Sequence, residues 1–217
     1  MTHRFEQIYS WLETNKPKVI LEIGTFNGKN AVNMMKKSGA EKYIGFDVWE
    51  EGSDELDEIE FNAKKRVTKA DAEALIKKGG FEYELIQGNT RVTLEEYAKD
   101  KKPFVDLVLI DGGHSSPTIG SDFSLVIKVA KTSGTIFLDD YYYGVPRKCV
   151  GCNHVLASLN APYTVLPKAD PVYPDGDGKA KGSVKLAQVE MRSLQITDRW
   201  SVPEEKRWTF SPSSPSG

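Results

Sequence analysis

Acidic and polar side chains follow several short apolar segments of this chain, and they are the residues best suited to chemistry. The stretch VDLVLIDGGHSS, residues 105–116, carries an apolar run up to Asp111, and two glycines and His114 follow. A carboxylate can bind a metal ion, and an imidazole with an ordinary pKa of about 6.5 can exchange a proton near neutral pH. The same stretch would also suit a plain strand end and turn, where Asp and Gly are common.

The apolar segments that precede these polar residues are predicted to be strands, because their lengths, β-branched content and terminal Gly or Asp are typical of strands. Helical segments lie between them, and several end in Lys followed by Ser-Gly or Gly-Gly. Strands that alternate with helices and are apolar on both faces indicate an α/β fold with a doubly wound parallel sheet. The predicted strands are residues 18–24, 42–48, 82–88, 105–112 and 134–140, with 163–167 and 183–191 as an antiparallel edge pair, and the predicted helices are 27–39, 69–80, 93–101 and 119–134.

The carboxyl ends of parallel strands share one edge of a sheet, and doubly wound proteins bind ligands at that edge. One acid at a strand end is usually a turn residue or a helix cap. Five consecutive strands that deliver polar groups to one edge favour a ligand site instead. The turn at residues 24–28 can bring backbone amides to a ligand. Phe26, however, stands where the dinucleotide pattern G-x-G-x-x-G needs its second glycine, which argues against a nicotinamide cofactor.

The composition limits the partners that we expect. The chain has 217 residues and a net charge of −2, so it has no long-range attraction for nucleic acid or an anionic membrane. No apolar stretch has the length of a membrane span and the polar start lacks a signal-peptide core, so we expect a cytoplasmic protein. Cys149, Cys152 and His154 offer only three of the four ligands of a structural zinc site. We therefore expect two reduced cysteines in a connecting loop.

One domain, residues 1–191, is expected to hold all the strands, with a C-terminal extension at 192–217 whose Ser/Pro-rich end has the composition of disorder. Two segments extend the strand–helix alternation: 49–66 is highly charged, and 167–182 is rich in Pro, Gly and Asp and is predicted to be a surface loop. Both are candidates for a lid or substrate loop. Together with residues 141–147 they would form the pocket for a substrate.

The motifs EIGTFNG, FDV, QGNT, LIDGGHS and FLDD, within residues 18–140, resemble those of class I S-adenosylmethionine-dependent methyltransferases. The resemblance is greatest to small-molecule O-methyltransferases of the catechol and macrolide-sugar (macrocin-like) groups. It implies a Rossmann-like sheet of about seven strands in the order 3-2-1-4-5-7-6, with the last strand antiparallel. It also implies S-adenosyl-L-methionine as cofactor and a divalent metal, Mg²⁺, as a second one.

The resemblance further implies roles for individual residues. Asp47 would hold the ribose hydroxyls of the cofactor, and His114 matches a proposed general base, with Asp111 beside it as a second catalytic residue. The Asp139–Asp140 pair favours the macrolide-like arrangement, because catechol-type enzymes carry Asp-Asn there. The implied cofactor residues are Glu22, Gly24, Thr25, Phe26, Gly28, Asp47, Val48, Asn89, Thr90 and Asp111, and the implied metal ligands are Asp111, Asp139 and Asp140.

The sequence thus predicts metal-assisted O-methylation of a small acceptor that carries a hydroxyl group. Two alternatives stay open. The chain could methylate nitrogen without a metal, with the acids acting as hydrogen-bond acceptors, or it could bind the cofactor without catalysis. The sequence leaves open whether the protein is a homo-oligomer.

Overall fold

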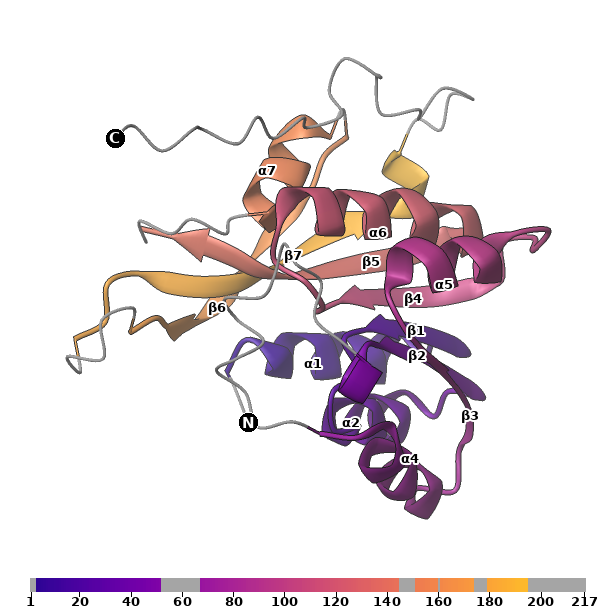
Figure 1. Cartoon of the computed structure of the whole chain (residues 1–217). Coiled ribbons are helices and arrows are strands. Elements are labelled where there is room, and N and C mark those ends of the chain that lie inside the picture. The colour runs from indigo at the N-terminus through magenta and orange to yellow at the C-terminus, as the bar shows by residue number, and fades with distance from the viewer. Residues whose placement is uncertain (1–2, 52–66, 145–150, 160, 174–178, 195–217) are drawn as a thin grey trace, which may run out of the picture.

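A computed structural model describes residues 3–51, 67–144, 151–159, 161–173 and 179–194 of the chain. Its centre is a seven-stranded sheet with the order β3-β2-β1-β4-β5-β7-β6 (Figure 1). Strands β1 to β5 are parallel, and β7 is antiparallel to both of its neighbours. The predicted fold class, strand order and antiparallel last strand are therefore confirmed. The strands are β1 Val19–Ile23, β2 Lys42–Asp47, β3 Glu82–Gln87, β4 Val105–Ile110, β5 Ala130–Tyr143, β6 Thr164–Pro171 and β7 Ser183–Glu190.

Helices cover both faces of this sheet (Figure 1). The α-helices are α1 Phe5–Asn15, α2 Lys29–Ser38, α4 Lys69–Lys78, α5 Thr90–Ala98, α6 Ser116–Val129 and α7 Gly151–Ser158, with short 3₁₀ turns at Trp49–Glu51 and Met191–Ser193. Successive side chains of a strand point to opposite faces. Leu107 and Leu109 of β4 accordingly pack with α1, α2 and α4, whereas Val108 and Ile110 pack with α5 and α6. In the part of the chain described, no helix is long and apolar enough to cross a membrane.

Three local predictions are wrong, and the first helix was missed. Residues 130–134, predicted to be the end of a helix, instead begin strand β5. Residues 167–171 belong to strand β6 rather than to a loop, because β6 is an edge strand and there a proline costs no ladder hydrogen bond on the open side. Cys152 lies buried in helix α7 rather than in a loop. The first helix, α1, has no counterpart among the predicted helices, since its N-cap residue Arg4 makes no side-chain cap. Cys149, residues 52–66 and the Ser/Pro-rich end lie outside the described residues, so their assignments stay predictions.

Gly24 marks the closest approach between the ends of two central strands. Its backbone has φ +89°, and a Cβ at this position would lie 1.9 Å from the carbonyl oxygen of Asp111. The amide of Asp111 also donates a 2.9 Å hydrogen bond to the carbonyl of Ile23. Only glycine allows this contact at such a φ. The turn after β1 and the end of β4 therefore form one continuous surface.

Gly24→Ala should lower the free energy of unfolding by about 3 kcal/mol or more, because the new methyl group both strains the left-handed backbone and overlaps Asp111. Gly39→Ala is a matched control, since Gly39 has φ +68° but a Cβ at this position would have no neighbouring atom within 4 Å. Backbone strain alone should cost that variant about 1 kcal/mol. Urea unfolding would measure both values. Equal losses in the two variants would show that the end of β4 relaxes around the methyl group.

Candidate active site

A β-bulge brings two consecutive acids to the same place at the end of β5. Leu138 pairs with Ala187 and Tyr141 pairs with Lys185, so β5 has one more residue than β7 between these pairs. In a regular strand, Asp139 and Asp140 would point to opposite faces. Here Asp140 adopts φ +60°, and the extra residue turns the strand locally, as bulges do. Both carboxylates therefore face the carboxyl edge of the sheet.

Three carboxylates meet at this edge, with ligand oxygens of Asp111, Asp139 and Asp140 within 4.8 Å of one another. Two basic side chains face them: Arg4 donates two 2.7 Å hydrogen bonds to Asp139, and Nε2 of His114 contacts Oδ2 of Asp140. Burial and the charges of the other two acids raise the pKa of Asp111 well above its usual range. Burial also raises the pKa of Asp139, against the effect of Arg4. Burial acts to raise the pKa of Asp140 as well, but the hydrogen bond and charge of His114 outweigh it and lower that pKa.

Helix α7 fixes the loop that carries His114. The amide of Gly151 donates to the carbonyl of His114 at 3.1 Å, and a Cβ on Gly151 would lie only 2.4 Å from that oxygen. Asn153, two residues further along α7, accepts a hydrogen bond from the amide of Tyr142 and donates one to its carbonyl. The hydroxyl of Tyr142 in turn donates to Asp140 at 3.1 Å. Helix α7 thus holds both the loop that carries His114 and the backbone just after the bulge.

Asp47 organises the turn after β1. Its two carboxylate oxygens accept hydrogen bonds from the amides of Phe26, at 2.7 Å, and Trp49, at 2.8 Å. The indole of Trp49 donates to the carbonyl of Phe26 at 2.9 Å. Phe26 has φ +49° and is 39% exposed. Asp47, the predicted ribose acceptor, therefore also holds the Gly24–Gly28 turn against the end of β2.

Glu22 lies buried at the end of β1, where the protein itself provides its donors. Oε1 accepts a 2.6 Å hydrogen bond from the side-chain amide of Asn30, and Oε2 contacts the hydroxyl of Tyr43. The hydroxyl of Tyr9 donates to Asn30 at 2.7 Å, which extends this network to α1. Burial raises the pKa of Glu22 to about 7, although the two hydrogen bonds oppose this rise. Glu22 therefore exchanges its proton near neutral pH.

The remaining predicted cofactor residues lie along the same edge, with structural contacts of their own. Thr25 is buried and shares a 3.1 Å hydrogen bond with Tyr43. Gly28 precedes α2 with φ +73°, and a Cβ there would lie 3.0 Å from Ile76 of α4, so this glycine allows close helix packing.

Asn89 is the N-cap of α5, and its side chain accepts a hydrogen bond from the backbone amide of Arg91. Val48, half-buried, and Thr90, buried, directly follow Asp47 and Asn89.

A divalent cation fits the acid cluster in donor chemistry and spacing. Mg²⁺ prefers carboxylate oxygens at 2.0–2.1 Å in an octahedron, which places its ligand atoms roughly 3 to 4 Å from one another. Asp111, Asp139 and Asp140 offer such oxygens within 4.8 Å of one another. Asp139 would have to share its carboxylate with Arg4, however, because both of its oxygens already accept hydrogen bonds from that side chain. In the part of the chain described, no other group of three potential ligand residues converges in this way.

Arg4, Asn30 and Tyr43 are site residues that the sequence alone did not identify, whereas Trp49 and Tyr142 were expected only as members of the pocket segments 49–66 and 141–147. Arg4 precedes an unpredicted helix, and Asn30 and Tyr43 belong to a predicted helix and strand in which nothing marks them as polar partners of Glu22. Trp49 and Tyr142 each lie two residues after an acid at a strand end, at 47 and 140, in segments expected to be substrate loops. Their position two residues after these acids was the only feature of the sequence that could have assigned them to the site.

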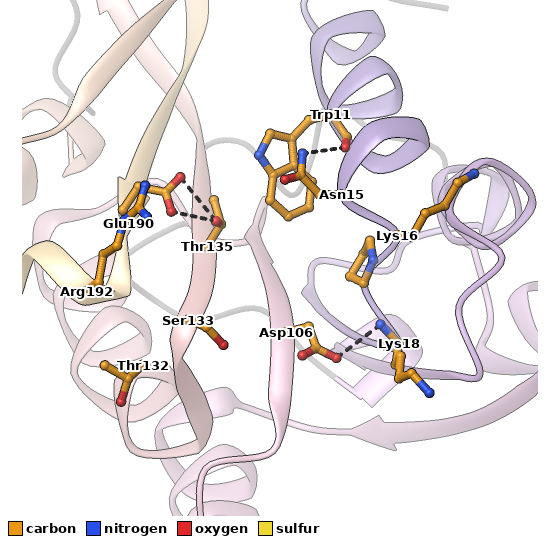
Figure 2. Close-up of a pocket in the computed structure, with 11 residues that line it drawn as sticks. Trp11, Asn15, Lys16, Lys18, Asp106, Thr132, Ser133, Thr135, Glu190 and Arg192 are labelled. Carbon is orange, nitrogen blue, oxygen red and sulfur yellow. Dashed lines mark hydrogen bonds between the residues drawn. The ribbon is translucent and has the colours of Figure 1, made fainter.

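A separate hollow of about 660 Å³ lies at the opposite, amino edge of the sheet (Figure 2). Trp11, Lys18, Asp106 and Glu190 are among its lining residues. Asp106 accepts hydrogen bonds from the amide of Lys18 and from the side chain of Lys131, and Glu190 accepts from Thr135. Its carboxylates thus bind strand starts and a neighbouring lysine. Ligands of doubly wound folds bind at the carboxyl edge, where the acid cluster lies.

Glu22→Gln should change how stability depends on pH. The pKa of folded Glu22 is about 7 against an ordinary value of 4.5, so its contribution to stability is fully present below pH 4.5 and is lost as the pH rises to about 7. The loss should amount to about 3 kcal/mol. Glutamine has no proton to lose, so the stability of Glu22→Gln relative to wild type should rise over this pH range. Urea unfolding from pH 4.5 to 8 in EDTA would measure it, and parallel curves for the two proteins would contradict the raised pKa.

Comparisons with known proteins agree with the fold and the strand-end motifs. The sequence profile of the family described as "Methyltransferase domain" (Methyltransf_24) matches residues 21–141, more than half of the chain. No curated protein matches the sequence. The structure is similar to that of an O-methyltransferase from Bacillus cereus in complex with SAH, with a TM-score of 0.58 and 16% identity over 85% of this chain and 79% of that one.

Two further solved structures are similar to this fold. One is the O-methyltransferase TomG from Streptomyces achromogenes, involved in tomaymycin synthesis and solved with SAM, with TM-score 0.58 and 16% identity over 85% of this chain and 78% of that one. The other is an rRNA methylase from Streptococcus thermophilus, with TM-score 0.57 and 13% identity over 90% of this chain and 99% of that one. From the profile match, the strand order and the motifs at the strand ends, the chain belongs to the methyltransferase-domain family and is a class I methyltransferase by fold.

Proposed function

We propose that this protein transfers a methyl group from S-adenosylmethionine to a hydroxyl group of a small molecule, with a divalent cation bound at the acid cluster. The observation that carries the proposal is the convergence of Asp111, Asp139 and Asp140 with His114 beside the turn at Gly24. A methyl donor on that turn and an acceptor on the acids would be immediate neighbours. Such an arrangement supplies the alignment that a bimolecular displacement needs.

The cofactor half of the proposal rests on the Gly24–Gly28 turn and Asp47. Asp47 is held by the amides of Phe26 and Trp49, and a carboxylate at the end of the second strand suits the two hydroxyls of a ribose. The B. cereus enzyme and TomG, which share this fold, were solved with SAH and SAM. S-adenosylmethionine supplies a methyl group already activated by its sulfonium. The protein has to position it and exclude water.

The acceptor half rests on the acids and His114. A bound divalent cation would acidify an acceptor hydroxyl by stabilising its deprotonated form. His114 directs Nε2 to Asp140, and an imidazole is the side chain best suited to take a proton near neutral pH. The carboxylate of Asp140 then stabilises the imidazolium, as a carboxylate partner of a catalytic histidine does. Helix α7 holds the loop at His114, so the imidazole is positioned before the acceptor binds.

S-adenosylhomocysteine should stabilise the protein by about 2.7 kcal/mol when its concentration is 100 times the dissociation constant, which for a chain of this size raises Tm by roughly 5 to 10 °C. NAD should not. Asp47→Asn should weaken the binding about tenfold, because the ribose hydroxyls lose a charged acceptor. Asp106→Asn, a matched change at the amino edge, should bind as wild type. Calorimetry and thermal shifts would measure both, and heat from NAD but none from S-adenosylhomocysteine would sink the proposal.

His114→Ala should slow the methyl-transfer step by about 10²- to 10⁴-fold, because a general base contributes that much. Its affinity for S-adenosylhomocysteine should stay unchanged. His3→Ala serves as control, since that imidazole is 74% exposed and lies against Glu6. Single-turnover transfer to an acceptor found among hydroxylated aromatics and sugars, with Mg²⁺ or with EDTA, gives the rates. A fully active His114→Ala would exclude the base, and indifference to EDTA would favour metal-free transfer.

A further inference from the structure

Arg4, the residue just before α1, reaches from the start of the chain into the acid cluster. Its Nε and Nη2 each donate a 2.7 Å hydrogen bond to one oxygen of Asp139, and its Nη1 donates a 2.9 Å hydrogen bond to Asp170 of β6. The side chains of Arg4, Asp139 and Asp170 are only 15%, 1% and 13% exposed. Paired in this way, the guanidinium holds both oxygens of Asp139 at once, which a lysine could not do.

The first turn of α1 is attached to strand β6, and this attachment fixes the position of Arg4 beside Asp139. The side chain of Gln7 donates to the carbonyl of Lys168 and accepts from its amide. The amine of Lys168 also pairs with Glu6 at 2.7 Å. Ile8 on the inner face of α1 is fully buried in the core. Two polar attachments and an apolar face therefore hold Arg4 where it meets Asp139.

The charges at this edge account for the position of Arg4. Asp139 lies beside Asp111 and Asp140, and its carboxylate is buried. A nearby cation stabilises buried like charges that would otherwise have to be relieved by protonation, because neither water nor distance screens them. His114 provides one such partner for Asp140, and Arg4 provides a permanent positive charge for Asp139 and Asp170. The protein therefore supplies at this cluster the kind of charge that a bound metal would supply.

We propose that Arg4 is a built-in counter-ion that competes with a divalent cation for Asp139, so that the first turn of α1 sets the metal affinity of the site. This rests on the proposed function, in which Asp111, Asp139 and Asp140 hold the cation. A metal that takes an oxygen of Asp139 displaces a hydrogen bond from Arg4 and meets its positive charge. By linkage, metal binding must loosen Arg4 to the same extent that Arg4 weakens metal binding.

Mn²⁺ binding to the full-length protein, followed by calorimetry and by the paramagnetic resonance of free Mn²⁺, tests this directly without cofactor or acceptor. Arg4→Gln should bind Mn²⁺ about tenfold more tightly than wild type, within the usual range of coupling between two sites. Arg4→Lys keeps the charge but loses the paired geometry, and its affinity should rise less. Glu13→Gln removes the ion pair of α1 with Lys37, at the far end of the helix, and should leave Mn²⁺ binding unchanged.

A second background shows whether the effect passes through Asp139. In Asp139→Asn the Arg4→Gln change should no longer raise the affinity. Unchanged or weaker Mn²⁺ binding by folded Arg4→Gln and Arg4→Lys, or an equal gain in the Asp139→Asn background, would overturn the role of Arg4 while leaving the metal site intact. Absence of Mn²⁺ binding in wild type and in every variant would overturn the metal site, and the competition with it. The S-adenosylhomocysteine affinity of each variant, measured in parallel, reports separately on the cofactor half of the proposed function.

Discussion

Compensation of negative charge at one edge of the sheet is the constraint on which the surrounding structure depends. Parallel strands must end at the same edge, and here their ends bring Glu22, Asp47, Asp111, Asp139 and Asp140 together. A buried carboxylate needs donors or a counter-ion, or it takes up a proton. Each neighbouring element supplies one of these. Backbone amides of two turns bind Asp47, α2 and β2 bind Glu22, the start of α1 binds Asp139, and the loop held by α7 binds Asp140.

The bulge in β5 shows how local strain serves this arrangement. Asp140 adopts a left-handed backbone conformation at φ +60°, which costs a non-glycine residue of order 1–3 kcal/mol. The hydrogen bond from the Tyr142 hydroxyl and the contact with His114 hold the residue there, and Asn153 in turn binds the backbone of Tyr142. Without the bulge only one of the two acids could join Asp111. The strained residue is thus the one that completes the cluster.

Much of this architecture could be predicted from the sequence, because each parallel strand is a separate apolar run with an acid or glycine at its end. The strand order followed from the motif resemblance, and the polar strand ends identified the edge. The position of Arg4 could not be predicted, since nothing local marks an arginine before a weakly capped helix as a partner of an acid 135 residues away. The bulge also has no local signature, because an Asp-Asp pair is equally suited to a regular turn. Cys152 was misplaced because a helix of eight residues is hard to distinguish from a loop by periodicity.

The acids at this edge are not equally stabilised by the protein, and this difference affects ligand binding. Asp47 is held by two backbone amides, whereas Glu22 and Asp111 have pKa values raised mainly by burial. A ligand that brings positive charge to this edge relieves those two acids, because it favours their ionised forms. The sulfonium and ammonium groups of S-adenosylmethionine and a divalent cation all carry such charge. The acids that destabilise the unliganded edge are therefore the groups that would favour the proposed ligands. Arg4 supplies part of the required positive charge when no ligand is bound.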